Sequence, residues 1–309
     1  MKATFLPHFL CVAAIAVNLA ARPAAAAERV LFDGQPPAPA GITLGGWGSG
    51  SATYTGEEQY EGGGVLRIKV RDFYQGARLD FREPIDLTPV LRQANAYLSL
   101  TVKLGGSAQA APAVAPDMGM LAPGMDPGAM PGMAAPQAPV AKVTKLRIVL
   151  QGETGSFELY PMHDIEPTDT GWVTVGIPLE SLKERIGEGT FRVKRLVLTA
   201  NAPDTLSVAR IQAINDDTEI TADATPSQFN EIPVGQPVRF TAEARAGVTP
   251  LKLCWDFDAS DGVQEEAVGA SVEHTFSKPG RYTVTFTAKP ADQADKQPRV
   301  TTMEIQVVD

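Results

Sequence analysis

Few side chains in this sequence could carry catalysis. Beyond its first 27 residues the chain has two histidines, His163 and His274, and one cysteine, Cys254. It contains no HExxH or GxSxG motif, no paired cysteine ligands and no glycine-rich phosphate loop. A pair of carboxylates can hydrolyse a glycoside without histidine, but nothing singles out one pair among the 36 acidic residues. We therefore predict a protein that binds a ligand and is not an enzyme.

Aromatic side chains beside planar polar groups indicate a different chemistry, the binding of sugars. Flat rings stack on the faces of sugar rings, and amide or guanidinium groups reach the hydroxyls. Candidates of these types lie in the first third of the chain: Trp47, Tyr54, Tyr60, Tyr74, Gln75 and Arg78. A bulge at Gly76 could bring Tyr74 and Arg78 together, or the two could simply close a corner of a sheet. We expect Trp172 in core or edge packing.

Two further groups of residues could ligate metal ions. Thioethers are soft ligands suited to Cu(I), and a low-complexity stretch contains five methionines: Met118, Met120, Met125, Met130 and Met133. Their irregular spacing, with no histidine or cysteine nearby, is also typical of a linker. Asp256, Asp258 and Asp261 could bind calcium, but aspartates in such a turn more often accept hydrogen bonds from backbone amides. We expect no catalytic cofactor.

Alternation of apolar and polar residues predicts strands in most of residues 28–214, apart from the low-complexity stretch, and again near the end of the chain. Helical periodicity is confined to about two turns in residues 179–186. The clearest alternating runs are residues 66–70, 98–104, 146–150, 173–179, 238–242, 251–257, 282–288 and 303–307. Short strands punctuated by Gly, Pro and Asp turns predict an all-β protein of two sandwiches in tandem.

The later runs carry a resemblance to a known family. The sequence LKLCWDFDASDG at residues 251–262 and the sequence VEHTFSKPGRYTVTFTA at residues 272–288 resemble the polycystic kidney disease (PKD) repeat. The resemblance implies an immunoglobulin-like β-sandwich that acts as a spacer or adhesive module. It rests on a set of mainly structural residues: Trp255, Asp256, Phe257, Gly262, His274, Pro279, Gly280 and Tyr282. We expect these side chains in the core and corners of the sandwich.

The first part of the chain carries a second resemblance. VLFDG at residues 30–34, DFYQGARLDF at residues 72–81 and GWVTVGIPLESL at residues 171–182 are similar to galactose-binding-like jelly rolls. Carbohydrate-binding modules of secreted glycoside hydrolases share that fold. The resemblance implies a jelly-roll β-sandwich with a glycan ligand. It also implies a structural calcium ion held by acidic residues, among which Asp33 and Glu58 are candidates.

The N-terminus predicts export. Lys2 precedes an apolar run at residues 9–21, and the alanines at residues 25–27 would suit cleavage of a bacterial-type signal peptide. The run is too short for a membrane span, which needs about twenty residues. The leucine before Cys11 argues against a lipidation site. We expect a secreted or periplasmic protein with no membrane span after signal cleavage.

Charge and composition limit the partners. Removing residues 1–27 takes away two basic and no acidic residues, so the net charge of −9 becomes −11. An acidic protein is not expected to bind nucleic acid by neutralising phosphates. Cys254 would be the only thiol left, so no intramolecular disulfide could form, and we expect a monomer. The predicted domains are a first sandwich at residues 28–214 with a disordered loop at 105–141, a linker and domain start at 215–235, and a second sandwich at 236–309.

Three functions remain open at this point. The first is glycan binding by the jelly roll, with the PKD-like sandwich as a spacer or adhesive module. The second is a structural or protein-interaction role in the cell envelope, without a sugar site. The third is periplasmic binding of Cu(I) by the methionine-rich loop.

Overall fold

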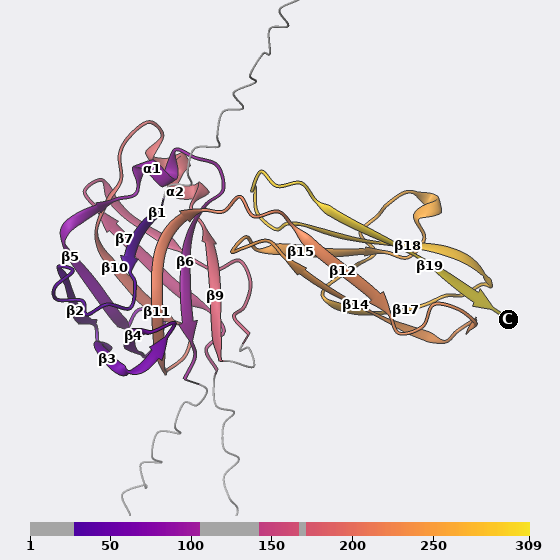
Figure 1. Cartoon of the computed structure of the whole chain (residues 1–309), viewed down its shortest axis with the longest axis horizontal. Helices are drawn as coiled ribbons and strands as arrows, with labels where there is room; N and C mark the ends of the chain where they lie inside the picture. Colours follow the sequence, from indigo (N-terminus) through magenta and orange to yellow (C-terminus); the bar gives the residue numbers. More distant parts are fainter. Residues whose placement is uncertain (1–27, 106–141, 167–170) are drawn as a thin grey trace, which may run out of the picture.

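The computed structural model describes residues 28–105, 142–166 and 171–309. Figure 1 shows two β-sandwiches in tandem, which confirms the predicted all-β class. The predicted signal peptide and the five loop methionines lie outside the described residues. Two short helices, α1 (Thr88–Leu91) and α2 (Glu180–Ile186), lie at one end of the first sandwich.

Two antiparallel sheets form the first sandwich. Sheet 1 has the order β3–β4–β11–β6–β9, and β1 pairs with the C-terminal part of β11. Sheet 2 has the order β2–β5–β10–β7–β8. The strands of sheet 1 are β1 (Glu28–Phe32), β3 (Ser51–Tyr60), β4 (Gly63–Val70), β6 (Ala96–Lys103), β9 (Trp172–Pro178) and β11 (Asp204–Asn215). Those of sheet 2 are β2 (Ile42–Trp47), β5 (Gly76–Asp86), β7 (Leu146–Gly152), β8 (Gly155–Leu159) and β10 (Arg192–Ala200).

The alternation in the sequence decides which face of each strand meets the core. On β5, Ala77, Leu79 and Phe81 are buried in the core between the two sheets. Because successive side chains of a strand point to opposite faces, Arg78 and Asp80 lie on the outer face of sheet 2. The core side of β5 is thus apolar, and its outer side carries polar groups.

The second sandwich also has two sheets. Sheet 3 has the order β12–β14–β17, and sheet 4 the order β13–β19–β18–β15–β16, in which β13 is parallel to β19. The strands of sheet 3 are β12 (Thr221–Pro226), β14 (Pro237–Arg245) and β17 (Ser271–Thr275). Those of sheet 4 are β13 (Ile232–Pro233), β15 (Leu251–Asp256), β16 (Ala267–Val268), β18 (Gly280–Pro290) and β19 (Arg299–Val308), and a 3₁₀ turn, η1 (Ala259–Asp261), follows β15.

The sandwiches join at a buried polar cluster, which we call the junction node. β11 ends at Asn215, and Oδ2 of the next residue, Asp216, accepts hydrogen bonds from the amides of Val248 (2.8 Å) and Thr249 (2.9 Å) and pairs with Lys296 (3.1 Å). The side chains of Asp216 and Lys296 are only 3% and 4% exposed. A buried charge needs such partners, so the node holds two loops of the second sandwich against the end of β11.

Further contacts attach the second sandwich to sheet 1. Tyr97 on β6 donates a hydrogen bond to Asp292 (2.6 Å), and Gly176 on β9 packs so tightly that a Cβ there would lie 1.8 Å from the carbonyl oxygen of Val248. Figure 1 accordingly shows the second sandwich beside β6 and β9. The outer face of sheet 2 lies on the other side of the first sandwich.

Candidate functional site

The outer face of sheet 2, which we call the binding face, carries ordered rows of side chains across five strands. Strand pairing aligns Gly45, Arg78, Val197, Val149 and Glu158 in one row. The next row is Thr43, Asp80, Arg195, Gln151 and Ser156. With neighbouring strands about 4.8 Å apart, each row spans roughly 19 Å. The face is therefore broad enough for an extended ligand.

One ionic group on this face is centred on Asp80. The carboxylate lies between two guanidinium groups, because Arg195 Nε donates to Oδ1 and Arg78 Nε lies 3.2 Å from Oδ2. Arg195 also reaches Gln151 Oε1 at 3.4 Å. Three adjacent strands thus fix the positions of these side chains by cross-strand contacts.

A second ionic group is centred on Arg147. Its guanidinium donates to both oxygens of Glu158 (2.5 and 3.1 Å) and to the carbonyl of Phe73 (3.1 Å), and it lies 5.5 Å from the centre of the Tyr74 ring. Tyr160 donates to Glu158 Oε2 at 2.8 Å. The hydrogen bonds from Arg147 and Tyr160 lower the pKa of Glu158, and the bond to Glu158 raises the pKa of Arg147. The pair is therefore ionised at neutral pH.

Two tyrosine rings stand beside this ionised pair and face solvent. Tyr74 is 73% exposed and Tyr160 is 48% exposed, although large aromatic side chains gain free energy from burial. Arg147 holds one face of the Tyr74 ring by a cation–π contact. Exposed rings fixed by charged neighbours are what stacking against a sugar ring requires.

The loops that border the face are tied together by Gln75. Its Oε1 accepts hydrogen bonds from the amide (3.2 Å) and hydroxyl (2.5 Å) of Ser49, and its Nε2 donates to Asp72 (2.8 Å). Gly48, at φ +64°, packs against the same side chain. Gln75 therefore holds the turn after Trp47 against the turn that carries Tyr74.

The six candidate sugar-binding residues do not all meet. Trp47 and Arg78 lie on the outer side of sheet 2, with Tyr74 and Gln75 in the adjoining loop. Tyr54 donates a hydrogen bond to the Gly34 carbonyl (3.1 Å) and packs on the core, whereas Tyr60 contacts Trp172, at 5.0 Å between ring centres, in sheet 1. The structure thus gathers four of the six candidates around the binding face.

Sequence reasoning missed most of the charged residues of the face. They are Asp80, Arg147, Glu158 and Arg195, and the polar residues Gln151 and Tyr160 were missed with them. The alternation of Leu146, Ile148 and Leu150 already put the residues between them on the outer side of that strand. That local pattern could not reveal which neighbouring strands would complete the site.

The second sandwich buries most of its aromatic side chains. Trp255 is fully buried, its ring centre lies 4.7 Å from that of Phe286 and 5.6 Å from that of Phe240, and its indole N–H donates to the Gly269 carbonyl (2.9 Å). Residues 207–307 match the model of the PKD domain family. The second sandwich is a PKD domain. No curated protein matches the chain.

The other motif residues of the PKD domain have structural contacts. His274 stacks on Phe257 with 4.0 Å between ring centres, and Tyr282 donates to the Lys278 carbonyl (2.9 Å) across the turn that contains Pro279 and Gly280. Burial lowers the pKa of His274. The family match begins inside β11, which the structure pairs within sheet 1, whereas the sheets of the PKD domain begin with β12.

The carboxylates considered for calcium have protein partners. Asp256 accepts from the amides of Asp258 (3.0 Å) and Gln264, the corner role that aspartates usually have. Glu58 accepts from Ser207 (2.7 Å) and Lys103 (3.2 Å), and although burial alone would raise its pKa, these bonds lower it. Within the described ranges, no three His, Cys, Asp or Glu residues are grouped so that they could hold a metal ion.

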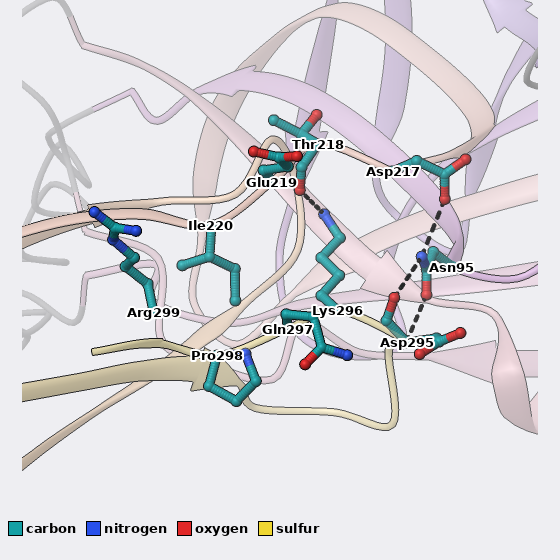
Figure 2. Close-up of a pocket in the computed structure, with 10 residues that line it drawn as sticks. All are labelled: Asn95, Asp217, Thr218, Glu219, Ile220, Asp295, Lys296, Gln297, Pro298 and Arg299. Carbon is teal, nitrogen blue, oxygen red and sulfur yellow. Dashed lines mark hydrogen bonds between the residues drawn. The ribbon is translucent and has the colours of Figure 1, made fainter.

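A polar cleft of about 390 Å³ lies where the PKD domain meets the first sandwich. Figure 2 shows Asn95 in this cleft between Asp217 and Asp295. Its amide donates to Asp217 Oδ1 (3.1 Å) and its Oδ1 accepts from the Asp295 amide (2.8 Å). Lys296 Nζ donates a hydrogen bond to the Thr218 carbonyl (2.8 Å). These groups bond one another and fasten the junction, so the binding face is the better candidate site.

In the part of the chain that the structure describes, no helix combines the length and apolarity that crossing a membrane would need.

Proposed function

We propose that this is an exported, non-catalytic protein that binds a glycan on the outer face of sheet 2, with the PKD domain as its spacer or adhesive module. The observation that carries the proposal is the pair of exposed rings, Tyr74 and Tyr160, on either side of the Arg147–Glu158 pair. The match to PKD domains supports an extracellular adhesion or spacer role for the second sandwich. The jelly-roll resemblance of the first sandwich agrees with a sugar ligand.

The shape of the face supports binding to the interior of a polysaccharide chain. Side chains from five strands form its rows, and the small residue Gly45 and the buried Val197 and Val149 lie among the polar groups. Exposed rings next to hydrogen-bonding groups match the two kinds of surface of a sugar ring. The fixed positions of the charged groups reduce the entropy lost on binding.

The test is affinity electrophoresis of the full-length protein through gels that contain a panel of polysaccharides. We expect retardation on at least one polysaccharide, and a loss of affinity of about tenfold for each of Tyr74→Ala and Tyr160→Ala. Tyr60→Ala is the matched control, because it removes a ring from sheet 1. No retardation on any polysaccharide, or a loss with Tyr60→Ala alone, would refute the proposal.

The alternative is a protein-interaction role in the cell envelope. It is favoured by two exposed apolar residues of the PKD domain, Phe229 (44% exposed) and Val234 (37%). Both border the end of β19, since the Phe229 carbonyl accepts from Gln306 and the Val234 amide donates to Val308. Capture of one envelope protein that is abolished by Phe229→Ser, without any retention on glycans, would select this function.

A further inference from the structure

We propose that the ligand of the binding face is an acidic glycan, and that Arg78 binds its carboxylate or sulfate group. This inference rests on the proposed function, because it names the class of sugar bound at the same site. It starts from a charge imbalance on the face. Arg78, Arg147 and Arg195 face only two carboxylates, those of Asp80 and Glu158.

Among these three arginines, Arg78 is the one with the fewest partners. Arg147 has three hydrogen bonds to Glu158 and Phe73, and Arg195 has contacts to Asp80 and Gln151. Two lysines that border sheet 2 have acidic partners of their own: Lys145 pairs with Asp164, and Lys194 with Glu153.

Arg78 has a single polar contact in the described structure. Its Nε lies 3.2 Å from Asp80 Oδ2 but is buried and makes no hydrogen bond, because the alignment with that oxygen is poor. Its two terminal nitrogens have no hydrogen bond or ion pair to another described residue, and the side chain is 40% exposed. Since Asp80 also pairs with Arg195, one carboxylate serves two cations. The outer edge of the Arg78 guanidinium is therefore open to an anion from solvent.

The neighbouring strand shapes the space around this group. A Cβ on Gly45 would lie 2.8 Å from Arg78 Nε, so the glycine lets the guanidinium lie close against β2. Trp47 is two residues further along the same strand and on the same face. A planar guanidinium fork binds a carboxylate or sulfate through two parallel hydrogen bonds. An acidic sugar could thus contact an aromatic residue and this fork together.

The experiment compares three probes on the full-length protein: polygalacturonate for the carboxylate, a sulfated galactan for the sulfate, and a neutral galactan. We expect one acidic probe to bind about tenfold more tightly than the neutral one at low salt, a preference equal to one charge-assisted hydrogen-bonded pair. The preference should weaken as salt screens the pair. Which acidic probe is preferred identifies the anion.

Variants locate the preference on Arg78. Arg78→Gln should abolish it, so that this variant binds the acidic probe no more tightly than it binds the neutral galactan, whereas Arg281→Gln, an exposed change on the PKD domain, should leave the preference at its wild-type value. Gly45→Ala keeps the charge but displaces the guanidinium, and should weaken the preference as well. A preference that survives Arg78→Gln would overturn the assignment. Retention of the neutral probe with no acidic preference would overturn this inference alone, and no retention on any probe would overturn the proposed function with it.

Discussion

The family motif of the PKD domain and the outer face of sheet 2 use aromatic side chains in opposite ways. In the PKD domain Trp255, Phe240 and Phe286 are fully buried, and the ring of Trp255 contacts the other two. In the first sandwich Tyr74 and Tyr160 face solvent around an ionised pair. The residues that identify the second sandwich as a PKD domain thus stabilise its fold. Recognition is better sought in the first sandwich, whose exposed rings have no role in a core.

The two sandwiches also differ in net charge. Residues 216–309 contain 16 acidic and 8 basic residues, a net charge of −8, whereas residues 28–215 contain 20 acidic and 17 basic residues, a net charge of −3. Long-range repulsion would keep an anionic polymer away from the PKD domain. The arginines of sheet 2 lie on the less acidic sandwich.

The largest expected loss of stability tests this contrast between buried and exposed aromatic side chains, using two tryptophans, Trp255 and Trp47. Trp255→Ala should destabilise the protein by about 3–5 kcal/mol, because it removes a fully buried ring and leaves a cavity. Trp47→Ala should cost much less, since its side chain is only partly buried at the edge of sheet 2. Urea unfolding followed by circular dichroism measures both. Equal losses in the free energy of unfolding would mean that Trp47 is a core residue and not a sugar-binding residue.

The second prediction tests whether the junction node stabilises the protein and fixes the angle between the two sandwiches. Asp216→Ala leaves Lys296 buried without its carboxylate, so we expect a loss of about 3 kcal/mol and a change in the angle between the sandwiches. The double variant Asp216→Ala/Lys296→Met removes the stranded charge and should recover much of the stability. Chemical unfolding and small-angle X-ray scattering provide the two readouts. An unchanged scattering profile in Asp216→Ala would mean that other contacts, such as Tyr97 to Asp292, fix the angle.

Lowering the pH should reduce the stability that Asp216 contributes at the junction node. Burial alone would raise the pKa of Asp216, but hydrogen bonds from Thr218 and Thr249 keep it below 3.8. A carboxylate with a lowered folded-state pKa contributes stability above its unfolded pKa, and that contribution is lost as the pH falls through the folded value. We therefore expect the stability difference between wild type and the double variant to shrink below about pH 4. A difference that stays constant down to pH 2 would contradict this.

Local sequence patterns predicted the strands well and the site only in part. The alternation of Leu146, Ile148 and Leu150 encodes burial directly, and these residues form β7. The position of Tyr74 over Arg147 depends on β10 pairing with both β5 and β7, which lie far apart in the sequence. Periodicity carries no information about such pairing. Gln75 shows the same limit, because its partner Ser49 belongs to another loop.

The smallest expected effect is the pH dependence of stability that His274 contributes, and it tests the claim that PKD motif residues are structural. Its ring stacks on Phe257 (4.0 Å) and meets the edge of Phe276 (4.6 Å), and burial lowers its pKa from 6.5. The unfolded chain binds a proton at higher pH than the folded one does. His274 therefore contributes full stability above pH 6.5, and this contribution is lost as the pH falls from 6.5 towards the folded pKa.

His274→Phe keeps an aromatic ring in the stack and removes the titration. We expect its stability to vary less than that of the wild type between pH 7 and pH 5, as measured by urea unfolding at each pH. His163→Phe is the control, because that histidine is exposed and belongs to the first sandwich. If glycan binding changed with His274→Phe while stability did not, the PKD domain would take part in recognition, and the division between a binding sandwich and a spacer would fail.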